Sequence, residues 1–413
     1  MTLTLAVRKT LHRRGCGKLA HFWHIRFCTR DLIKAEASKC IDEFAGVEDG
    51  SWNQASQAFA PRRVDIAVSA RQCDYNLRTP HSRRPPLFEL VITLLLAAHL
   101  LCVNVASAGP LVGMWLEWRE GRGDGLAGQT ASYLGRACWW SLLAGGLLGL
   151  AVGLLSWTAE YAALWSGPMH HKATWAIAEY FFSLALAAGY LLWRSRAATQ
   201  LRGLRIFVLF LAGSNLLYHF PFLFTVANDL FVQDQLAIAQ QVSPLSASEF
   251  RLQMARPDVL ARVVHVVLAS FAVTGIVLLG YCLRLQRQGT AQGDAQRVAR
   301  WGGWLALIPS LIQVPVGLWL IAVLPPAWQA RALGDDLLAL GLLGTSVLLA
   351  LFLLQELSTL AFGEMERKHA VRAMVSMVLV VFLMTSVLRR IRPTLPETAR
   401  PPITAELSMM IVQ

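Results

Sequence analysis

The chain has 413 residues, of which 55% are hydrophobic and only 15% are charged, and its formal net charge is +12. Its mean hydropathy of +0.46 lies outside the range of ordinary soluble domains and indicates a polytopic membrane protein. No Walker loop, GxSxG elbow, HExxH helix or dinucleotide fingerprint is present, which argues against a nucleotide-driven pump or a membrane protease. The basic residues cluster at span ends, a pattern that favours lipid headgroups over nucleic acid.

Residues 1–87 form a basic, proline-broken arm with no sustained helical or strand period. Cys16, Cys28 and Cys40 recur every twelve residues near three histidines, a spacing that permits a metal site, although no CxxC pair is present. The opening residues lack the apolar core of a cleavable signal peptide. The alternatives to a metal site are a disordered arm or coding sequence upstream of the true start.

Eight apolar runs follow the arm, each of roughly 20 residues and therefore long enough to cross a ~30 Å hydrocarbon core as a helix. They lack the short period-two segments of a membrane barrel. The sequence predicts an all-α, polytopic transmembrane helix bundle of about eight spans within residues 88–390, followed by a short tail over 391–413. The predicted spans are 88–115, 137–158, 174–193, 206–227, 263–284, 303–324, 337–362 and 371–388.

Arginine and lysine are unevenly shared between the two sides of the predicted membrane. The connections after spans 1, 3, 5 and 7 hold 13 of them, whereas those after spans 2, 4 and 6 hold 5. By the positive-inside rule this places the N-terminus outside, in an integral protein of a bacterial inner membrane. The arginine-rich arm and the arginines at the end of the last span argue the other way.

Ionisable side chains at membrane depth are costly and mark functional sites by default. His99 is predicted near mid-membrane on the first span, and Glu179, His219 and His265 in the outer half of the third, fourth and fifth. Imidazole is a common axial ligand of haem iron, so four polar groups converging from four helices suit a haem or an ion site. Spacing alone leaves open satisfied structural histidines or a site for a transported ion.

The order of these features resembles subunit I of the cytochrome bd quinol oxidases. His99 precedes the glycine-rich GGLLGLAVG, Glu179 lies in AIAEYFF, and His219 lies in SNLLYHFP. His265 lies in VVHVVLASFAVTG and Met374 in HAVRAMV. The resemblance implies b-type haem, with His99 ligating one haem and His265 another, opposite Met374 or His219. It also makes Glu179 the nearby catalytic carboxylate.

The resemblance covers roughly residues 88–285, with a detached echo at 369–382. It implies electron transfer within a respiratory complex, by quinol oxidation or oxygen reduction, with a second membrane subunit or a cytochrome as partner. The chain departs from the family at Ala187, which replaces a carboxylate, and in the short segment LPPAWQARALGDD, which replaces the long quinol loop. It also lacks the late E-x-G-R-Q-P-W segment. The alternative function is a non-haem membrane scaffold or transporter whose buried histidines are structural or carry ions.

The predicted topology separates Met374 from His265. The fifth span begins outside and the eighth begins inside, so two residues near these starts are predicted at opposite faces.

Three further residues each have two possible roles. His170 and His171 suit a metal site or a solvated loop, and Glu356 suits a proton carrier or, as we favour, a structural ion pair.

Overall fold

The computed structural model describes residues 86–196, 201–233, 244–289, 292–363 and 366–392. The arm predicted over 1–87 lies outside these ranges except for its last two residues. Cys16, Cys28 and Cys40, with the metal site that their spacing permits, therefore fall outside the described residues. So does the tail beyond residue 392.

The described part of the chain is helical and contains no strand, as the all-α prediction requires. Eight of its helices are long and apolar enough to cross a membrane, which confirms the predicted number of spans and an integral membrane protein. They are α4 (Pro86–Glu120), α5 (Gly125–Leu155), α7 (His170–Arg196), α8 (Arg202–Gln233), α11 (Pro257–Arg287), α12 (Gln292–Val323), α14 (Leu337–Phe362) and α15 (Arg367–Ile391).

Every long helix except α14 begins before its predicted span, because hydropathy marks only the part of a helix that suits hydrocarbon. The clearest case is α5, which begins at Gly125 rather than at residue 137. Asp124 caps it by accepting a hydrogen bond from the backbone N–H of Ala127 at 3.3 Å. The connection between α4 and α5 is therefore a tight turn.

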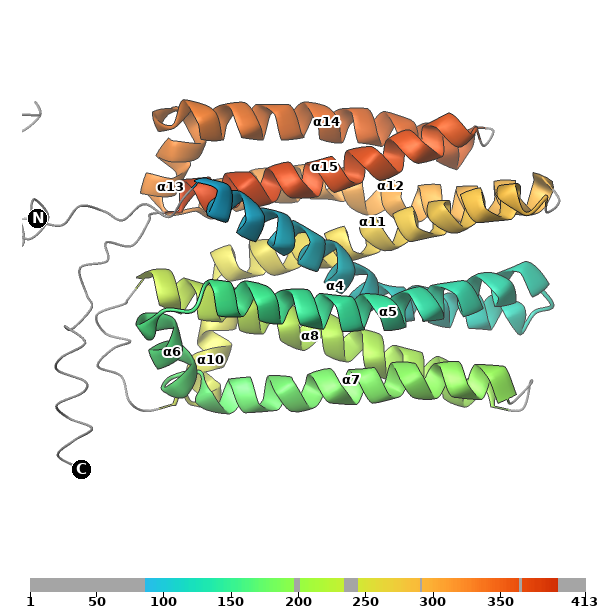
Figure 1. Cartoon of the computed structure of the whole chain (residues 1–413), viewed down its shortest axis with the longest axis horizontal. Helices are drawn as coiled ribbons and strands as arrows, with labels where there is room; N and C mark the ends of the chain where they lie inside the picture. The colour runs from blue at the N-terminus through green and yellow to red at the C-terminus, as the bar shows by residue number, and fades with distance from the viewer. Residues whose placement is uncertain (1–85, 197–200, 234–243, 290–291, 364–365, 393–413) are drawn as a thin grey trace, which may run out of the picture. The chain divides into compact units, whose positions relative to one another are not determined.

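Short helices at the span ends were not predicted from the sequence. Thr158 and Ser246 each begin one by accepting a backbone hydrogen bond, and Ser246 completes a capping box with Glu249. These elements are α6 (Ala159–Ser166), α10 (Ala247–Met254), α13 (Pro326–Ala330) and a π-helical turn at Arg331–Asp335. In Figure 1, α6 and α10 lie at the end of the bundle where α5 finishes and α7 begins.

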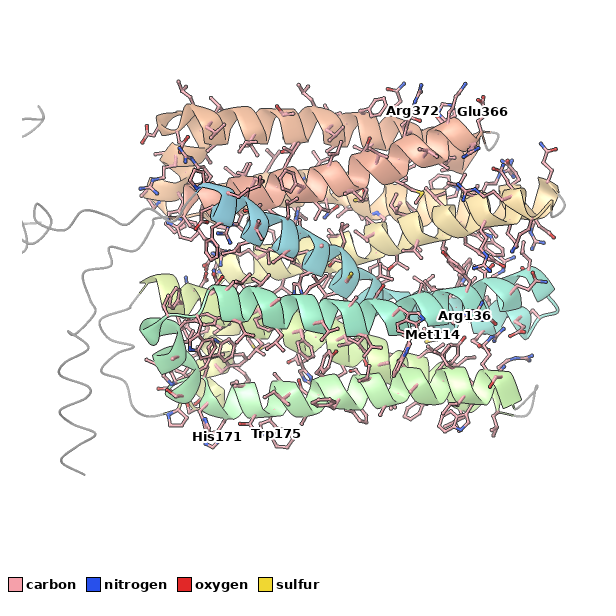
Figure 2. All side chains as sticks on the ribbon, in the orientation of Figure 1. Met114, Arg136, His171, Trp175, Glu366 and Arg372 are labelled. Carbon is pink, nitrogen blue, oxygen red and sulfur yellow. The ribbon has the colours of Figure 1, made fainter. Side chains whose placement is uncertain are left out.

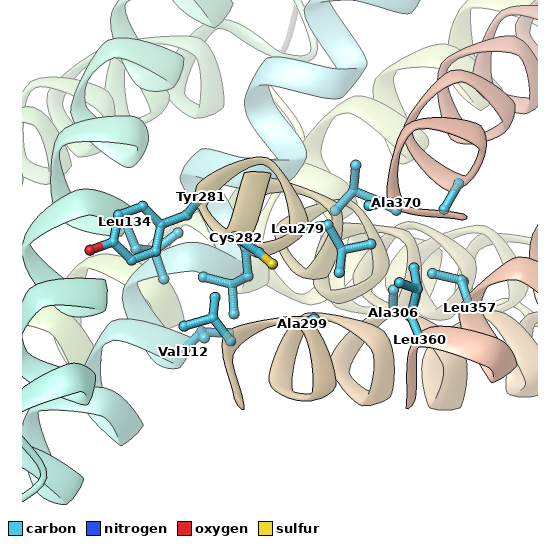
Figure 3. Packing of buried hydrophobic residues seen from close by; sticks show 14 of the residues in the cluster. Val112, Leu134, Leu279, Tyr281, Cys282, Ala299, Ala306, Leu357, Leu360 and Ala370 are labelled. Carbon is cyan, nitrogen blue, oxygen red and sulfur yellow. The ribbon is translucent and has the colours of Figure 1, made fainter. Parts of the chain in front are cut away.

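The long helices pack as two groups of four, in chain order. α4, α5, α7 and α8 form the first group, and α11, α12, α14 and α15 form the second. α4 runs obliquely between the groups and also contacts α11 and α15 (Figure 1). The largest apolar cluster lies where the groups meet, and Figure 3 shows part of it around Leu279 and Cys282.

Two close contacts fix α11 in this arrangement. A Cβ added to Gly275 would lie 2.7 Å from the carbonyl oxygen of Gly302, so the backbones of α11 and α12 touch at this level. On the side of α4, the hydroxyl of Ser270 donates to Oδ1 of Asn104 at 2.9 Å, and both side chains are buried. This hydrogen bond holds α4 and α11 at a common depth.

Candidate functional site

His99 lies on α4 and packs against the glycine-rich face of α5. Its Nδ1 is 2.8 Å from the carbonyl oxygen of Gly145, and a Cβ added to Gly149 would lie 2.6 Å from its Cε1. The ring therefore needs glycine at position 149. Because a carbonyl oxygen only accepts, the contact requires the tautomer protonated at Nδ1. That tautomer leaves Nε2 with a free lone pair, the arrangement of a histidine ready to ligate a metal.

His265 lies on α11 and differs from His99 in its partners. Its backbone carbonyl accepts a hydrogen bond from Nε2 of Gln313 at 3.2 Å. Its ring Nδ1, in contrast, is buried and has no hydrogen-bond partner among the described residues. A buried polar atom without a partner costs about 1–3 kcal/mol. The ring of His265 thus has a nitrogen without a partner in the described part of the chain.

The two histidines lie at one depth but face apart. Each precedes a member of the Asn104–Ser270 hydrogen bond by five residues, which places each about 7.5 Å before that bond along its own helix. Five residues also turn a helix by about 140° beyond a full turn. Since Asn104 and Ser270 face each other, His99 and His265 face away from the contact between α4 and α11. They therefore suit two separate sites rather than one.

Glu179 and His219 are brought together between α7 and α8. Oε2 of Glu179 is 3.0 Å from Nδ1 of His219, which is also 2.8 Å from Oδ1 of Asn215. Asn215 in turn donates to the hydroxyl of Ser183 at 2.9 Å. The His219 side chain is 42% exposed and that of Glu179 is 23% exposed. An ionisable pair therefore reaches the lateral surface of the described bundle at membrane depth.

Met374 lies far along α11 from His265. It packs against the level of Gly280, where an added Cβ would be 3.6 Å from its Cε. Gly280 follows His265 by fifteen residues, which corresponds to about 22 Å of helix. The structure thus brings Glu179 to His219 but does not bring Met374 to His265.

Glu356 forms ion pairs inside the bundle, in agreement with the structural role that we favour from its sequence. It is buried on α14, with one oxygen beside Nδ1 of His369 and the other 3.6 Å from Nη1 of Arg372. His170 and His171 lie at the start of α7, with ring centroids 5.7 Å apart. Figure 2 shows His171 on the outer side of that helix, away from the other helices. Among the described residues, no three metal-binding side chains cluster, so neither histidine belongs to such a group.

One buried ion cluster was missed from the sequence. Glu117, near the end of α4, is fully buried and pairs with Arg194 of α7 and with Arg205 of α8 at 3.1 Å. The hydroxyl of Tyr190 donates to the same carboxylate at 2.8 Å. The available signal was the pair of acidic residues in LEWRE, at the end of one span, together with the basic residues at the ends of two others. The cluster is fully paired, which fits a role in joining three helices.

The donor atoms of the two separate histidines fit haem. Haem iron takes a neutral imidazole nitrogen, and Nε2 of His99 and the ring of His265 can supply one. The carbonyl of Gly145 would orient the first ring. His219 is a weaker candidate for the iron ligand opposite His265. Its Nδ1 is already in contact with Asn215 of the same helix and with Glu179.

Comparison with known proteins supplies a fold relative. No protein-family model matches the sequence, and no curated protein matches it. The solved structure titled as bd oxidase from Geobacillus thermodenitrificans is similar, with a TM-score of 0.62, over 79% of this chain and 93% of the matched chain. Sequence identity is 15%, so the likeness concerns the fold. It supports a fold distantly like that of bd oxidase, while leaving residue roles to the chemistry of the site.

Proposed function

We propose that this chain is a b-type haem protein of a respiratory complex in a bacterial inner membrane, and that it passes electrons within the membrane. His265 ligates one haem and His99 a second, as in the resemblance to subunit I of cytochrome bd oxidase. A bound haem would supply an iron that accepts and donates single electrons. The N-terminus lies outside, and a second membrane subunit or a cytochrome is the partner.

The observation that carries the proposal is the unpartnered ring nitrogen of His265. Its buried Nδ1 has no partner among the described residues. The helix bundle that contains it has a fold distantly like that of a bd oxidase. Iron bound at Nδ1 itself would remove the cost of that burial. His99 supports the proposal because its Nδ1 contact leaves Nε2 free for the iron.

Glu179 and His219 have a separate role in the proposal. Their contact at 3.0 Å can hold a proton between a carboxylate and an imidazole at membrane depth. This pair would accept or deliver protons when quinol is oxidised or oxygen is reduced. Met374 is not required, because it packs about 22 Å along α11 from His265.

The reduced-minus-oxidised visible spectrum of the purified chain tests the proposal. Expression with ample haem should give b-type bands, and His265→Ala should remove a low-spin component because its axial ligand is gone. The control is His171→Ala, which changes an exposed histidine at the start of α7 and should leave the spectrum intact. Bands that survive unchanged in the His265 variant would show that this assignment is wrong.

The alternative is a non-haem membrane scaffold or transporter. Its support is that protein groups already satisfy Nδ1 of His99 and of His219. In that case the histidines stabilise the helix contacts, or the Glu179–His219 pair carries an ion. A wild-type protein without haem bands would favour this alternative.

A further inference from the structure

A cluster of arginines lies at the end of the bundle where α4 and α11 begin and where α8 and α15 finish. Three of them have carboxylate partners in the structure. Arg262 pairs with Asp229 and with Asp258, the latter at 3.2 Å; Arg256 pairs with Asp258 at 2.9 Å; and Arg389 pairs with Glu89. A fourth, Arg392, directly follows α15. We name these four side chains the arginine cluster.

Arg392 differs from the other members of the arginine cluster. Its Nε is buried and has no hydrogen-bond partner among the described residues. Its charge interacts with those of Arg262, Arg389 and Asp229. Burial, together with repulsion from Arg262 and Arg389, lowers the pKa of Arg392 to about 10 despite attraction by Asp229. Among the described residues, the four arginines of the cluster face three carboxylates, Asp229, Asp258 and Glu89, and Arg392 forms an ion pair with none of them.

Arg392 and His265 are both related to Arg262. Arg262, which interacts with Arg392, precedes His265 by three residues on α11, or about 4.5 Å of helix. Residues three apart lie on neighbouring positions of one helix face. Arg262 is thus the link between the two unpartnered groups: its charge acts on Arg392, and it lies one turn of α11 from His265.

We propose that Arg392 binds the carboxylates of the haem whose iron His265 ligates. This inference rests on the proposed function. Haem is apolar over most of its surface, but it carries two propionates at one edge and a metal at its centre. Arginine pairs well with carboxylates because its planar N–H groups match their two oxygens. One ligand would then satisfy both unpartnered groups.

Equilibrium haem titration of the full-length apoprotein in detergent tests this proposal. The probes are haem and haem dimethyl ester, in which both carboxylates are blocked. Arg392→Gln should weaken haem binding by about tenfold or more, the loss expected for a charged hydrogen bond. It should leave ester binding unchanged. The midpoint potential of the bound haem should also become more negative, because a nearby positive charge stabilises the reduced form.

Two variants serve as controls. Arg390→Gln removes an exposed charge from the same helix end, where Nε of Arg390 lies 2.7 Å from Oδ2 of Asp336, and should change neither titration. Arg392→Lys keeps the charge and should recover part of the affinity. A circular dichroism melt of each apoprotein confirms that the variants are folded.

The remaining outcomes would overturn the inference in distinguishable ways. Equal weakening of haem and ester by Arg392→Gln would mean that Arg392 has only a structural role. Unchanged haem binding, with less phospholipid copurifying, would assign the cation to a lipid phosphate. In both cases the haem function stands. Wild-type protein that binds neither probe would remove this inference and the proposed function together.

Discussion

At the scale of single residues, three histidines within the membrane have three different environments. His99 is held by a backbone carbonyl, His219 is engaged by Glu179 and Asn215, and the ring of His265 is unpartnered in the described chain. All three are flanked by apolar residues in the sequence, so composition cannot distinguish them. The partner of each ring depends on which helix packs beside it.

Gly149 provides a direct test of how His99 is held. Gly149→Ala would place a methyl group 2.6 Å from Cε1 of His99, so the ring must move away from α5. We expect a destabilisation of about 1–3 kcal/mol, typical of overpacking, measured by thermal unfolding in detergent. In haem-loaded protein, the spectral component that depends on His99 should shift as well.

Gly153 is the matched control for this substitution. It lies one helical turn further along α5, and an added Cβ would meet nothing within 4 Å. Gly153→Ala should therefore leave stability unchanged or raise it, since alanine is the better helix former. Equal effects at the two glycines would mean that contact with His99 is not what requires glycine at position 149.

At the scale of the helices, the ends depend on local capping more than on hydropathy. Asp124 begins α5 twelve residues before the predicted span, and Asp336 begins α14 at the predicted position. Asp336 accepts hydrogen bonds from the backbone N–H groups of Leu338 and Ala339 at 3.1 and 3.2 Å. Such a cap stabilises the first turn while the carboxylate is charged.

The cap at Asp336 makes the start of α14 sensitive to acid. Hydrogen bonding from the backbone of Ala339, followed by Arg390, lowers the pKa of Asp336 below its ordinary value. A lowered pKa in the folded state means that its stabilisation is complete above about pH 3.9 and is lost as pH falls further. We expect amide hydrogen exchange at Leu338 and Ala339, corrected for intrinsic rates, to accelerate below that pH.

Asp336→Asn is the control, because its amide can still accept these hydrogen bonds but does not titrate in this range. Its corrected exchange rates should not change with pH. A wild-type profile as flat as that of the variant would show that ionisation of Asp336 does not hold the start of α14.

The sequence was sufficient to predict the helices but not the contacts between them. Runs of about 20 apolar residues predict spans because unsatisfied backbone groups are excluded from hydrocarbon. The pairing of Glu179 with His219, and of Glu117 with Arg194 and Arg205, depends on how each helix is rotated about its axis. These helices are apolar on nearly all sides, so periodicity gives little information about rotation.

At the scale of the whole molecule, the distribution of charge predicts an orientation in the membrane. The connection after α4 and the connection after α11 lie at the end of the bundle that carries most of the basic residues. The helices α10 and α13 belong to connections at the opposite end. We expect the first end to be cytoplasmic.

Cysteine labelling on intact cells tests this orientation in a cysteine-free background. Arg122→Cys and Gln288→Cys should react with an impermeant maleimide only after lysis. Ser248→Cys and Ala330→Cys should react before lysis, since all four positions are exposed at helix ends. The reverse pattern would place the N-terminus inside and would contradict the charge rule for this chain.

The hydrogen bond between Asn104 and Ser270 joins residues 166 positions apart. A chain is made from its N-terminus, so α4 exists well before α11 has been synthesised. Until then the side chain of Asn104 has to remain in a bilayer or in the insertion machinery without this partner. The contact that aligns the two histidine sites is therefore a late step of biogenesis, and a nascent chain that stops before α11 cannot form it.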